Sequence, residues 1–385
     1  MFIDIACSQK KKYNQNAYGD FFTSGRFPNM NRVVAVLSDG LGSGIKANIL
    51  ACMTSTMLLK FLENNSDIEK SCEIIMNSLP VCKVRGISYS TFSAIDCFEN
   101  GKAKIVEEGN PDFIWIRNGE VLKPEFQTIQ SKDFKNRKMK VYNIQLEKFD
   151  RIIFCSDGAT QVAMGTREYP LGLERNGLIK IILKKLELEP EISSKDLSEY
   201  LVRQIQCIAP RKELKDDTSI LSIYCRNPRE SIIFTGPPFH GEKDAYYAKT
   251  FMDFKGKKAI SGGTTANIIS RETNISINTD VSTNRGKLPG LSKMEGIDLV
   301  TEGILTLTKT LEYLQSEKAE DDAAKTLMDF LLDSDVINFL VGAQMNKAHY
   351  DPSLPIEIKI RKNVIQQMAK VLEEKYLKKV NVQFI

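Results

Sequence analysis

Histidine is scarce in this chain: only two occur in 385 residues, and the first of them is His240. A Ser-His-Asp triad or a histidine proton relay is therefore excluded from everything before that position. None of the eight cysteines stands in a Cys-x-x-Cys pair. With so few histidines to complete a ligand set, zinc and iron–sulfur sites are not expected. We expect reduced cysteines that fill a core.

The chain also lacks a strong charge imbalance and a long apolar run. Its formal net charge is +4, which is small for this length and gives no reason to expect a nucleic-acid or membrane partner. No stretch approaches the roughly 20 apolar residues of a membrane span. The apolar run before the lysines at 10–12 is too short for a signal peptide. We expect a cytoplasmic protein.

The uneven placement of cysteine bears on domain organisation. All eight cysteines lie between positions 7 and 225, and 385 residues are enough for two domains with their own cores. We therefore place a boundary near 225–231. The prediction is a first domain at 1–227 and a second, smaller domain at 228–385.

The beginning of the first domain shows one strand pattern and two helical patterns. The β-branched run at 32–38 predicts a buried strand. In the helix that follows, apolar residues recur every four positions and predict one apolar face, formed by Ile49, Met53, Met57 and Phe61 with Leu50, Leu58 and Leu62 beside them. A second helix is predicted at 66–79, with Ser66 and Glu69 as its capping box.

Hairpin signals dominate the rest of the first domain. Two Asn-Gly pairs, at 100–101 and 118–119, stand between strand-like runs and predict tight turns. Further along we expect strands at 151–155 and 216–225 and helices at 174–188 and 194–209. Hairpins combined with helices indicate mainly antiparallel sheets covered by helices, an α+β fold.

The second domain has the mixed pattern of a smaller α/β domain. The sequence does not identify its function, and we expect a regulatory role. It opens with the strand-like run at 231–238 and has helical stretches around 298–315, 320–341 and 361–376, with "IEIKI" and "NVQFI" beside the last of them. Gly262, Gly263, Thr264 and Thr265 lie between a short strand and a helix. Free N–H groups and hydroxyls at such a helix start suit an anion. A glycine turn with threonine as the helix cap is the simpler interpretation.

Four aspartates of the first domain share one context. Asp39 and Asp157 each follow an apolar strand and precede a glycine, Asp216 precedes a strand, and Asp20 follows a glycine. A rigid strand points a carboxylate at its end into the space beyond the sheet edge. Several carboxylates in one place repel one another unless a cation neutralises them. Oxygen ligands without histidine or cysteine select hard cations, Mg²⁺ or Mn²⁺.

The same residues do not match other known phosphate-binding patterns. The run "DGLGSGIK" lacks the Gly-Lys-Ser/Thr of a P-loop, and its acid precedes the glycines, where it would repel a pyrophosphate. No cysteine stands six residues before an arginine, so a thiolate phosphatase loop is absent. Of the phosphate chemistries considered, only metal-assisted hydrolysis is compatible with these residues. For any one of these aspartates taken alone, the alternative to a metal-ligand role is that Asp-Gly is simply a sequence favoured in tight turns.

The order of these motifs resembles a known family. Gly-Asp, Asp-Gly-x-Gly-x-Gly before a helix, Gly-Asn-Pro, Ser-Asp-Gly and Asp-Asp before a final strand follow one another over residues 1–225. This order is similar to that of the PPM (PP2C-type) metal-dependent serine/threonine phosphatases, in particular the bacterial SpoIIE/RsbU branch. The resemblance implies an α-β-β-α sandwich of mainly antiparallel sheets and two Mn²⁺ or Mg²⁺ ions.

The resemblance also implies roles for individual residues. Asp39 would bridge both ions, with the carbonyl of Gly40 helping to hold one of them. Asp157 and Asp216 would bind the other ion, and Asp20 would be a further acid in the metal or water shell. Asp39 and Asp157 would carry catalysis, in which a metal-bound water attacks the phosphorus of the substrate.

The sequence departs from the family pattern at two points. Thr218-Ser219 stands where the family commonly has a hydrophobic residue followed by threonine, and the phosphate-binding arginine of eukaryotic relatives has no counterpart. Asn110 matches the family's Gly-His/Asn-Pro strand and is interpreted as structural or as facing the substrate.

The family implies a phosphorylated regulatory protein as substrate, such as an anti-sigma-factor antagonist carrying phosphoserine or phosphothreonine. A homodimer is compatible with the sequence. The rival interpretation is a phosphatase-fold signalling or binding module with weak or no turnover. The full set of acids argues against it, because a degenerate member is expected to lose some of them.

Overall fold

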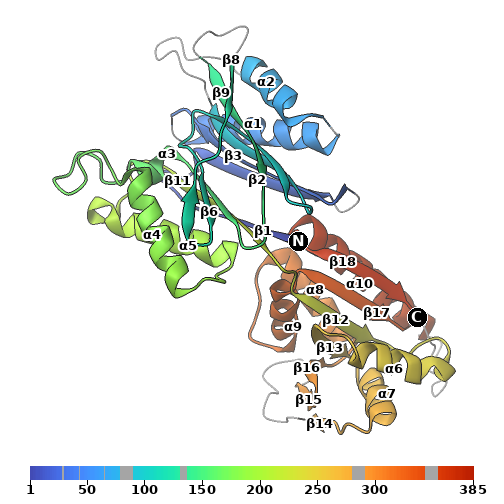
Figure 1. Cartoon of the computed structure of the whole chain (residues 1–385). Helices are drawn as coiled ribbons and strands as arrows, with labels where there is room; N and C mark the ends of the chain where they lie inside the picture. Colours follow the sequence, from blue (N-terminus) through green and yellow to red (C-terminus); the bar gives the residue numbers. More distant parts are fainter. Residues whose placement is uncertain are drawn as a thin grey trace. The chain divides into compact units, whose positions relative to one another are not determined.

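The structure is a computed structural model in which the chain forms two compact units, Met1–Asn227 and Pro228–Ile385 (Figure 1). It describes residues 1–27, 30–42, 44–64, 66–78, 90–130, 137–279, 291–342 and 354–385, with only the backbone for 354–359. Ser43 of the glycine motif, Leu79, Cys82 and His349 lie outside these ranges. All seven cysteines within them are free, and four are buried.

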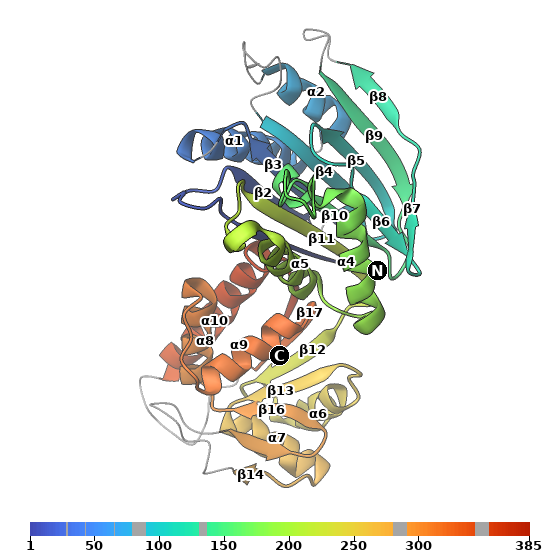
Figure 2. The same ribbon diagram turned by 90° about the vertical axis from the view of Figure 1, so that its left-hand side faces the viewer.

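The first unit contains two antiparallel sheets. The six-stranded sheet has the order β2 (Asp20–Phe27), β3 (Arg32–Gly40), β4 (Ser90–Phe98), β5 (Lys102–Glu108), β9 (Lys138–Gln145), β8 (Gln127–Gln130). The five-stranded sheet has the order β1 (Phe2–Lys10), β11 (Thr218–Arg226), β10 (Arg151–Cys155), β6 (Ile114–Arg117), β7 (Glu120–Leu122). Figure 2 shows the strands of the larger sheet one beside the next.

Helices cover the outer face of each sheet and give four layers. Alternation along β3 places Val33, Ala35 and Leu37 in the core between the sheets, together with residues of β10 and β11. Val34 and Val36 point the other way, to a core shared with α1 (Ile45–Glu63) and α2 (Ile68–Ser78). A third core joins the five-stranded sheet to α4 (Glu174–Leu188) and α5 (Ser194–Ile208). The predicted α+β fold with its α-β-β-α sandwich is confirmed.

Both predicted hairpins are present. Gly101, between β4 and β5, has a φ of +88°. Asn118 and Gly119, between β6 and β7, have φ values of +50° and +80°, as a type I′ turn requires at both central positions. The Asn-Gly signal is reliable here because it depends only on the backbone conformation of two residues.

The predicted inward face of α1 is partly wrong. Leu58 and Leu62 are fully buried as expected, whereas Ile49 and Met53 are about half exposed, at 51% and 50%. The other buried residues of the helix are Ala47, Ala51, Thr54 and Ser55. Small residues face the sheet because the first turn of α1 packs directly on the end of β3: a Cβ at Gly40 would lie 2.1 Å from the carbonyl oxygen of Ala47. By length and composition α1 could cross a membrane, a test that a helix packed on a sheet also passes.

The predicted capping box of α2 is also wrong. The carboxylate of Asp67 accepts the N–H groups of Glu69 and Lys70 and caps the helix. Glu69 is therefore not needed at the cap and pairs with Lys104 of β5, with Nζ and Oε1 2.6 Å apart. Ile68, Cys72 and Ile75 are buried as expected.

The second unit is built on one seven-stranded sheet. Its order is β14 (Asn278–Thr279), β15 (Ser292–Met294), β16 (Ile297–Thr301), β13 (Lys257–Ser261), β12 (Glu230–Thr235), β17 (Val336–Val341), β18 (Lys379–Phe384). The five strands from β16 to β18 are parallel. The two short strands at the other edge pair antiparallel.

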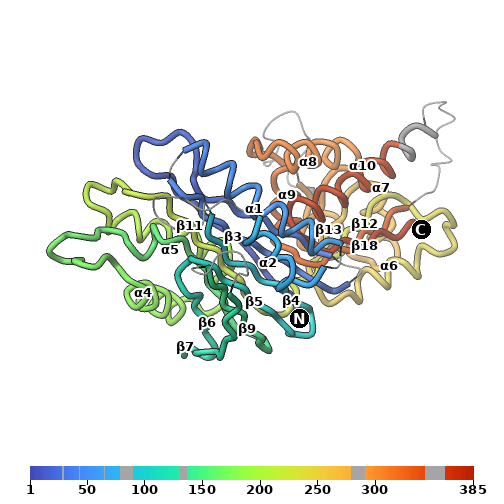
Figure 3. The backbone as a smooth tube through the Cα atoms, turned by 90° about the horizontal axis from the view of Figure 1, so that it is seen from above, coloured from blue at the N-terminus to red at the C-terminus, as the bar shows by residue number. Residues whose placement is uncertain are grey.

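Helices lie on both faces of this parallel sheet; in Figure 3, α8 (Ile304–Ser316) and α10 (Leu354–Glu374) lie on one side of β12 and β18 and α6 (Asp244–Met252) on the other. One face packs against α6 and α7 (Gly263–Thr273). The other packs against α8, α9 (Ala323–Asp333) and α10. The second unit is thus a doubly wound α/β structure.

Three assignments in the second unit need correction. Residues 297–301 form β16, where a helix was predicted to begin, and 336–341 form β17, where a helix was predicted to continue. "IEIKI", which was placed outside the helix predicted at 361–376, is part of α10. Strands buried on both faces of a parallel sheet are continuously apolar, so periodicity does not separate them from buried helices.

Candidate functional site

Asp20 and Asp39 face each other across neighbouring strands. Asp20 begins β2, Asp39 is the penultimate residue of β3, and the two are direct partners in the antiparallel register. Partners of this kind have Cβ atoms only about 5 Å apart. Two carboxylates at that separation repel strongly, so the pair needs a proton or a cation between them.

Asp157 and Asp216 approach the same place from the other sheet. Asp157 follows β10 and opens the short helix α3 (Asp157–Thr160), and Asp216 stands two residues before β11. The Asp39 carboxyl lies within hydrogen-bonding reach of Asp20 and Asp157, and Asp216 is near enough to act on its charge. The structure therefore brings together all four aspartates singled out in the sequence.

The crowding of these acids appears in their pKa values. Burial, followed by the charges of Asp20, Asp157 and Asp216, raises the pKa of Asp39 to about 9. Burial also raises the pKa of Asp20 to about 7, although hydrogen bonds from Ser219 and Ser156 oppose the shift. The pKa values of Asp157 and Asp216 are raised, chiefly by burial. Without a cation the cluster holds protons at neutral pH.

The two adjacent acids before β11 have different surroundings. The carboxylate of Asp217 is buried and accepts the backbone N–H groups of Lys12, at 3.1 Å, and Gly19, at 2.9 Å. It thus ties down the loop before β2. The carboxylate of Asp216 accepts the N–H of its neighbour Asp217 at 3.0 Å, and burial and the charge of Asp157 raise its pKa. Asp216 is therefore the member of the pair that belongs to the acid cluster.

Two serines that the sequence did not mark as site residues support the cluster. Ser219 Oγ donates to Asp20 Oδ2 at 2.6 Å, and it accepts from Gln9 Nε2 at 3.0 Å. Ser156 Oγ accepts the N–H of Ser219 at 3.0 Å. The departure Thr218-Ser219 thus has a structural use, since Ser219 orients Asp20. The only sequence signal was the departure itself.

Glycine is required next to two of the acids. A Cβ at Gly40 would overlap the Ala47 carbonyl at the start of α1, and a Cβ at Gly158 would lie 2.0 Å from the carbonyl oxygen of Asp217. These contacts bring the first turn of α1 against the end of β3, and the segment before β11 against α3. The Asp-Gly pairs therefore allow close backbone approach, which turn chemistry alone does not explain.

Asn110 has a structural role. Its side chain accepts from Thr91 Oγ1 at 2.5 Å and donates to Ser93 Oγ at 3.1 Å. These bonds join the loop after β5 to β4. The structure therefore supports the structural interpretation of Asn110 over the one in which Asn110 faces the substrate.

The donor set of the cluster fits hard cations. All four side chains offer carboxylate oxygens, the ligands that hard divalent ions prefer, and the charges of Asp20, Asp157 and Asp216 add to burial in raising the pKa of Asp39. Within the described ranges, no three acidic, cysteine or histidine side chains are already arranged around a point that could hold an ion.

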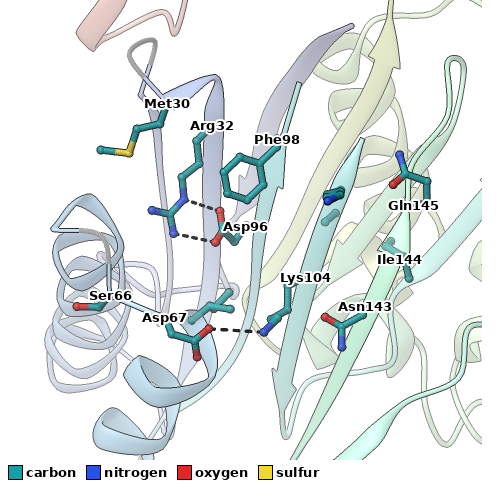
Figure 4. A pocket seen from close by; sticks show the side chains of 13 residues that line it. Met30, Arg32, Ser66, Asp67, Asp96, Phe98, Lys104, Asn143, Ile144 and Gln145 are labelled. Atoms are coloured by element: carbon teal, nitrogen blue, oxygen red, sulfur yellow. Dashed lines mark hydrogen bonds and ion pairs between the residues drawn. The ribbon is translucent and has the colours of Figure 1, made fainter. Parts of the chain in front are cut away.

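A pocket of about 810 Å³ lies at the opposite end of the larger sheet (Figure 4). Arg32 there pairs with Asp96 through Nε and Oδ1, 2.7 Å apart, and Lys104 lies 3.6 Å from Asp67. Arg32 begins β3 and Asp39 nearly ends it, so at about 3.3 Å per residue they are roughly 23 Å apart. This pocket is separate from the acid cluster.

The sequence of the first unit matches the model of a known protein family. The family model described as Stage II sporulation protein E (SpoIIE) matches residues 29–226, just over half of the chain. The chain belongs to the SpoIIE family. The predicted resemblance to PP2C-type phosphatases of the SpoIIE/RsbU branch is thereby confirmed. A search of curated proteins gave no match.

Solved structures of similar proteins include several phosphatases. The phosphatase domain of SpoIIE from Bacillus subtilis has 16% identity and a TM-score of 0.43, with 59% of this chain and 93% of that chain covered. RsbX in complex with magnesium has 20% identity and a TM-score of 0.40, covering 58% and 94%. The serine/threonine phosphatase of S. agalactiae has 15% identity and a TM-score of 0.41, covering 58% and 100%.

Proposed function

We propose that residues 1–227 are a metal-dependent protein phosphatase that hydrolyses phosphoserine or phosphothreonine. The observation that carries the proposal is the convergence of Asp20, Asp39, Asp157 and Asp216, from two sheets, on one place. Membership of the SpoIIE family supports the reaction class. The absence of histidine before position 240 leaves metal-assisted hydrolysis as the chemistry available to these residues.

Each acid has a distinct part in this proposal. Asp39, at the centre of the cluster, would hold two Mn²⁺ or Mg²⁺ ions with help from the Gly40 carbonyl, and Asp157 and Asp216 would hold one of them. When bound, such ions supply a nucleophilic water at neutral pH and neutralise charge on the phosphate. Asp20 is oriented by Ser219 and lies against Asp39, where it can hold a proton or a water.

The substrate we propose is a phosphorylated regulatory protein, such as an anti-sigma-factor antagonist. Its support is the family alone, because fold does not specify substrate. A pull-down with the Asp157→Asn variant in the presence of Mn²⁺ would retain a bound phosphoprotein that the unaltered chain releases after hydrolysis. Equal recovery of partners by both forms would contradict this assignment.

Hydrolysis of p-nitrophenyl phosphate tests the activity itself. We expect Mn²⁺-dependent turnover that EDTA abolishes and that Asp39→Asn lowers by orders of magnitude. Asp253→Asn, an exposed acid of the second unit, is the matched control and should keep the full rate. Full activity of metal-stripped protein in EDTA would overturn the proposal. Metal binding without turnover would instead favour the rival binding module.

A further inference from the structure

The parallel sheet of the second unit has a reversal in its strand order. Numbered along the chain, the strands β12, β13, β16, β17 and β18 lie in the spatial order third, second, first, fourth, fifth. The chain moves outward from β12 in one direction and returns to continue on its other side. Ligands of doubly wound sheets bind beyond the carboxyl ends of the strands, typically at such a reversal, which here lies between β12 and its neighbour β17. The carboxyl edge is therefore the place to look for a site.

Glycine follows four of the five parallel strands at this edge. Gly236 follows β12, Gly262 follows β13, Gly303 comes two residues after β16, and Gly342 follows β17. Gly262 has a φ of +127°, which disfavours any side chain. A Cβ at Gly303 would lie 3.6 Å from the Cα of Gly262. The segments that open α7 and α8 are therefore in contact.

Neither of these helices has a side-chain cap. Gly262 precedes α7 and Gly303 precedes α8, and among the residues that the structure describes no side chain caps either helix. By contrast, α9 of the same unit is capped by Asp322, which accepts the N–H of Lys325 at 2.9 Å. The first N–H groups of α7 have no partner within the helix, and Gly263 and Thr264 are exposed. This arrangement leaves donors accessible to an anion.

A buried hydroxyl points to the same place. Thr265, in the first turn of α7, is 0% exposed, and its Oγ1 has no hydrogen-bond partner among the described residues. That oxygen would be 3.5 Å from a Cβ at Gly262, so it faces the start of the helix beside Gly303. Thr306 occupies the equivalent position in α8 and is likewise buried without a partner in the described part of the chain. An unpaired buried hydroxyl is unfavourable unless a ligand or water satisfies it.

Charge at the edge is mixed. The guanidinium of Arg361 lies against Gly236 at the end of β12, where a Cβ would be 2.6 Å from Nη1. The side chain of Glu302, between β16 and α8, is exposed. A cation and helix N-termini favour a phosphate. An acid beside them suits the hydroxyls of a sugar and disfavours a second phosphate.

We propose that the carboxyl edge of this sheet binds a small molecule carrying one phosphate group. The N–H groups of Gly263 and Thr264 and the hydroxyl of Thr265 would hold the phosphate at the start of α7. This site is independent of the acid cluster in the first unit, and nothing in the proposed phosphatase activity requires it.

Calorimetric titration of the full chain in EDTA tests the proposal, because EDTA silences any metal-dependent phosphatase site. The probes are AMP, adenosine and inorganic phosphate. Binding of AMP but not adenosine would support the site and identify a nucleotide-like ligand. Binding of inorganic phosphate with equal strength would support the site and identify free phosphate as sufficient. Absence of binding by both phosphate-bearing probes would overturn the proposal.

Two variants locate the binding. Gly263→Asp places a carboxylate where the phosphate would lie; a Cβ there meets nothing within 4 Å, so the fold should be kept. We expect affinity to fall about tenfold or more through like-charge repulsion. Asn274→Asp adds the same charge at the other end of α7 and is the control. Phosphate binding unchanged by Gly263→Asp would also overturn the proposal.

Thr265→Val removes the buried hydroxyl while keeping the shape of the side chain. Affinity should fall, whereas Thr326→Val, in the first turn of the already capped α9, should leave it unchanged. Thermal unfolding without ligand separates a binding effect from a folding effect. Equal loss of affinity in both threonine variants would contradict the role of Thr265.

Discussion

In the first unit the strand ends bring carboxylates together, whereas in the parallel sheet of the second unit they carry glycines and hydroxyls. Asp39 and Asp157 stand at strand ends on a rigid sandwich, where their repulsion creates a demand for a cation. Gly262 and Gly303 expose helix N-termini, where partial positive charge creates a demand for an anion. In both proposals the residue type at a strand end, more than the type of sheet, sets the sign of the ligand.

The largest expected effect comes from removing one acid. Asp157→Asn should lower Mn²⁺-dependent turnover by about 10³-fold or more, because it removes a charged ligand while keeping the shape of the side chain. Phosphatase kinetics at saturating Mn²⁺ measure this. The same variant should leave AMP binding in EDTA unchanged. An effect on both measurements would break the distinction between the two units.

A second prediction concerns stability and the buried face of α1. Leu58→Ala should lower the free energy of unfolding by about 2–5 kcal/mol, since Leu58 is fully buried. Ile49→Ala should change it by less than about 0.5 kcal/mol, since Ile49 is half exposed. Urea unfolding provides both values. Comparable losses in the two variants would place Ile49 on the inward face, as the sequence suggested.

A third prediction concerns how the folding stability of the metal-free protein depends on pH, because the acid cluster binds protons. In the unfolded chain Asp titrates near pH 4, whereas in the folded protein the pKa is raised to about 9 for Asp39 and about 7 for Asp20. The folded state therefore binds more protons between these values, so its stability is full below about pH 4 and is lost as the pH rises toward 9.

Urea midpoints in EDTA at pH 5 and pH 8 measure this loss, which we expect to shrink in Asp39→Asn and on adding Mn²⁺. Glu107 needs a control variant, Glu107→Gln, because burial raises its pKa to about 8 and acts in the same direction. A midpoint that does not fall between pH 5 and pH 8 would show that the folded protein does not hold these acids protonated.

The smallest expected effect concerns Ser219. Ser219→Ala removes the 2.6 Å hydrogen bond to Asp20, and we expect Mn²⁺ affinity to fall about tenfold with little change in the rate at saturating metal. The activity measured as a function of Mn²⁺ concentration tests this. Ser222→Ala, on the same strand, is the control: its Oγ has no hydrogen-bond partner in the described part of the chain. Identical metal dependence in the two variants would exclude an orienting role.

Features that depend on neighbouring residues were predictable from the sequence. The turn at Asn118-Gly119 and the helix at Glu174–Leu188 follow from backbone preference and local periodicity, and both lie where the sequence placed them. The candidate acids could be found for the same reason, because an apolar strand followed by Asp-Gly is a local pattern. Family membership was also visible, since the order of motifs survives low overall identity.

Tertiary structure alone decided the features that depend on residues far apart in the chain. Ser219 meets Asp20 across 199 positions, and Asp216 differs from Asp217 only in what the fold places beside each. The inward face of α1 depended on its close approach to Gly40, which no helical period records. In the second unit, buried strands and buried helices are equally apolar, so only their pairing separated β16 and β17 from the neighbouring helices. Hydrophobic burial specifies that a segment is inside, and long-range contacts specify what it meets there.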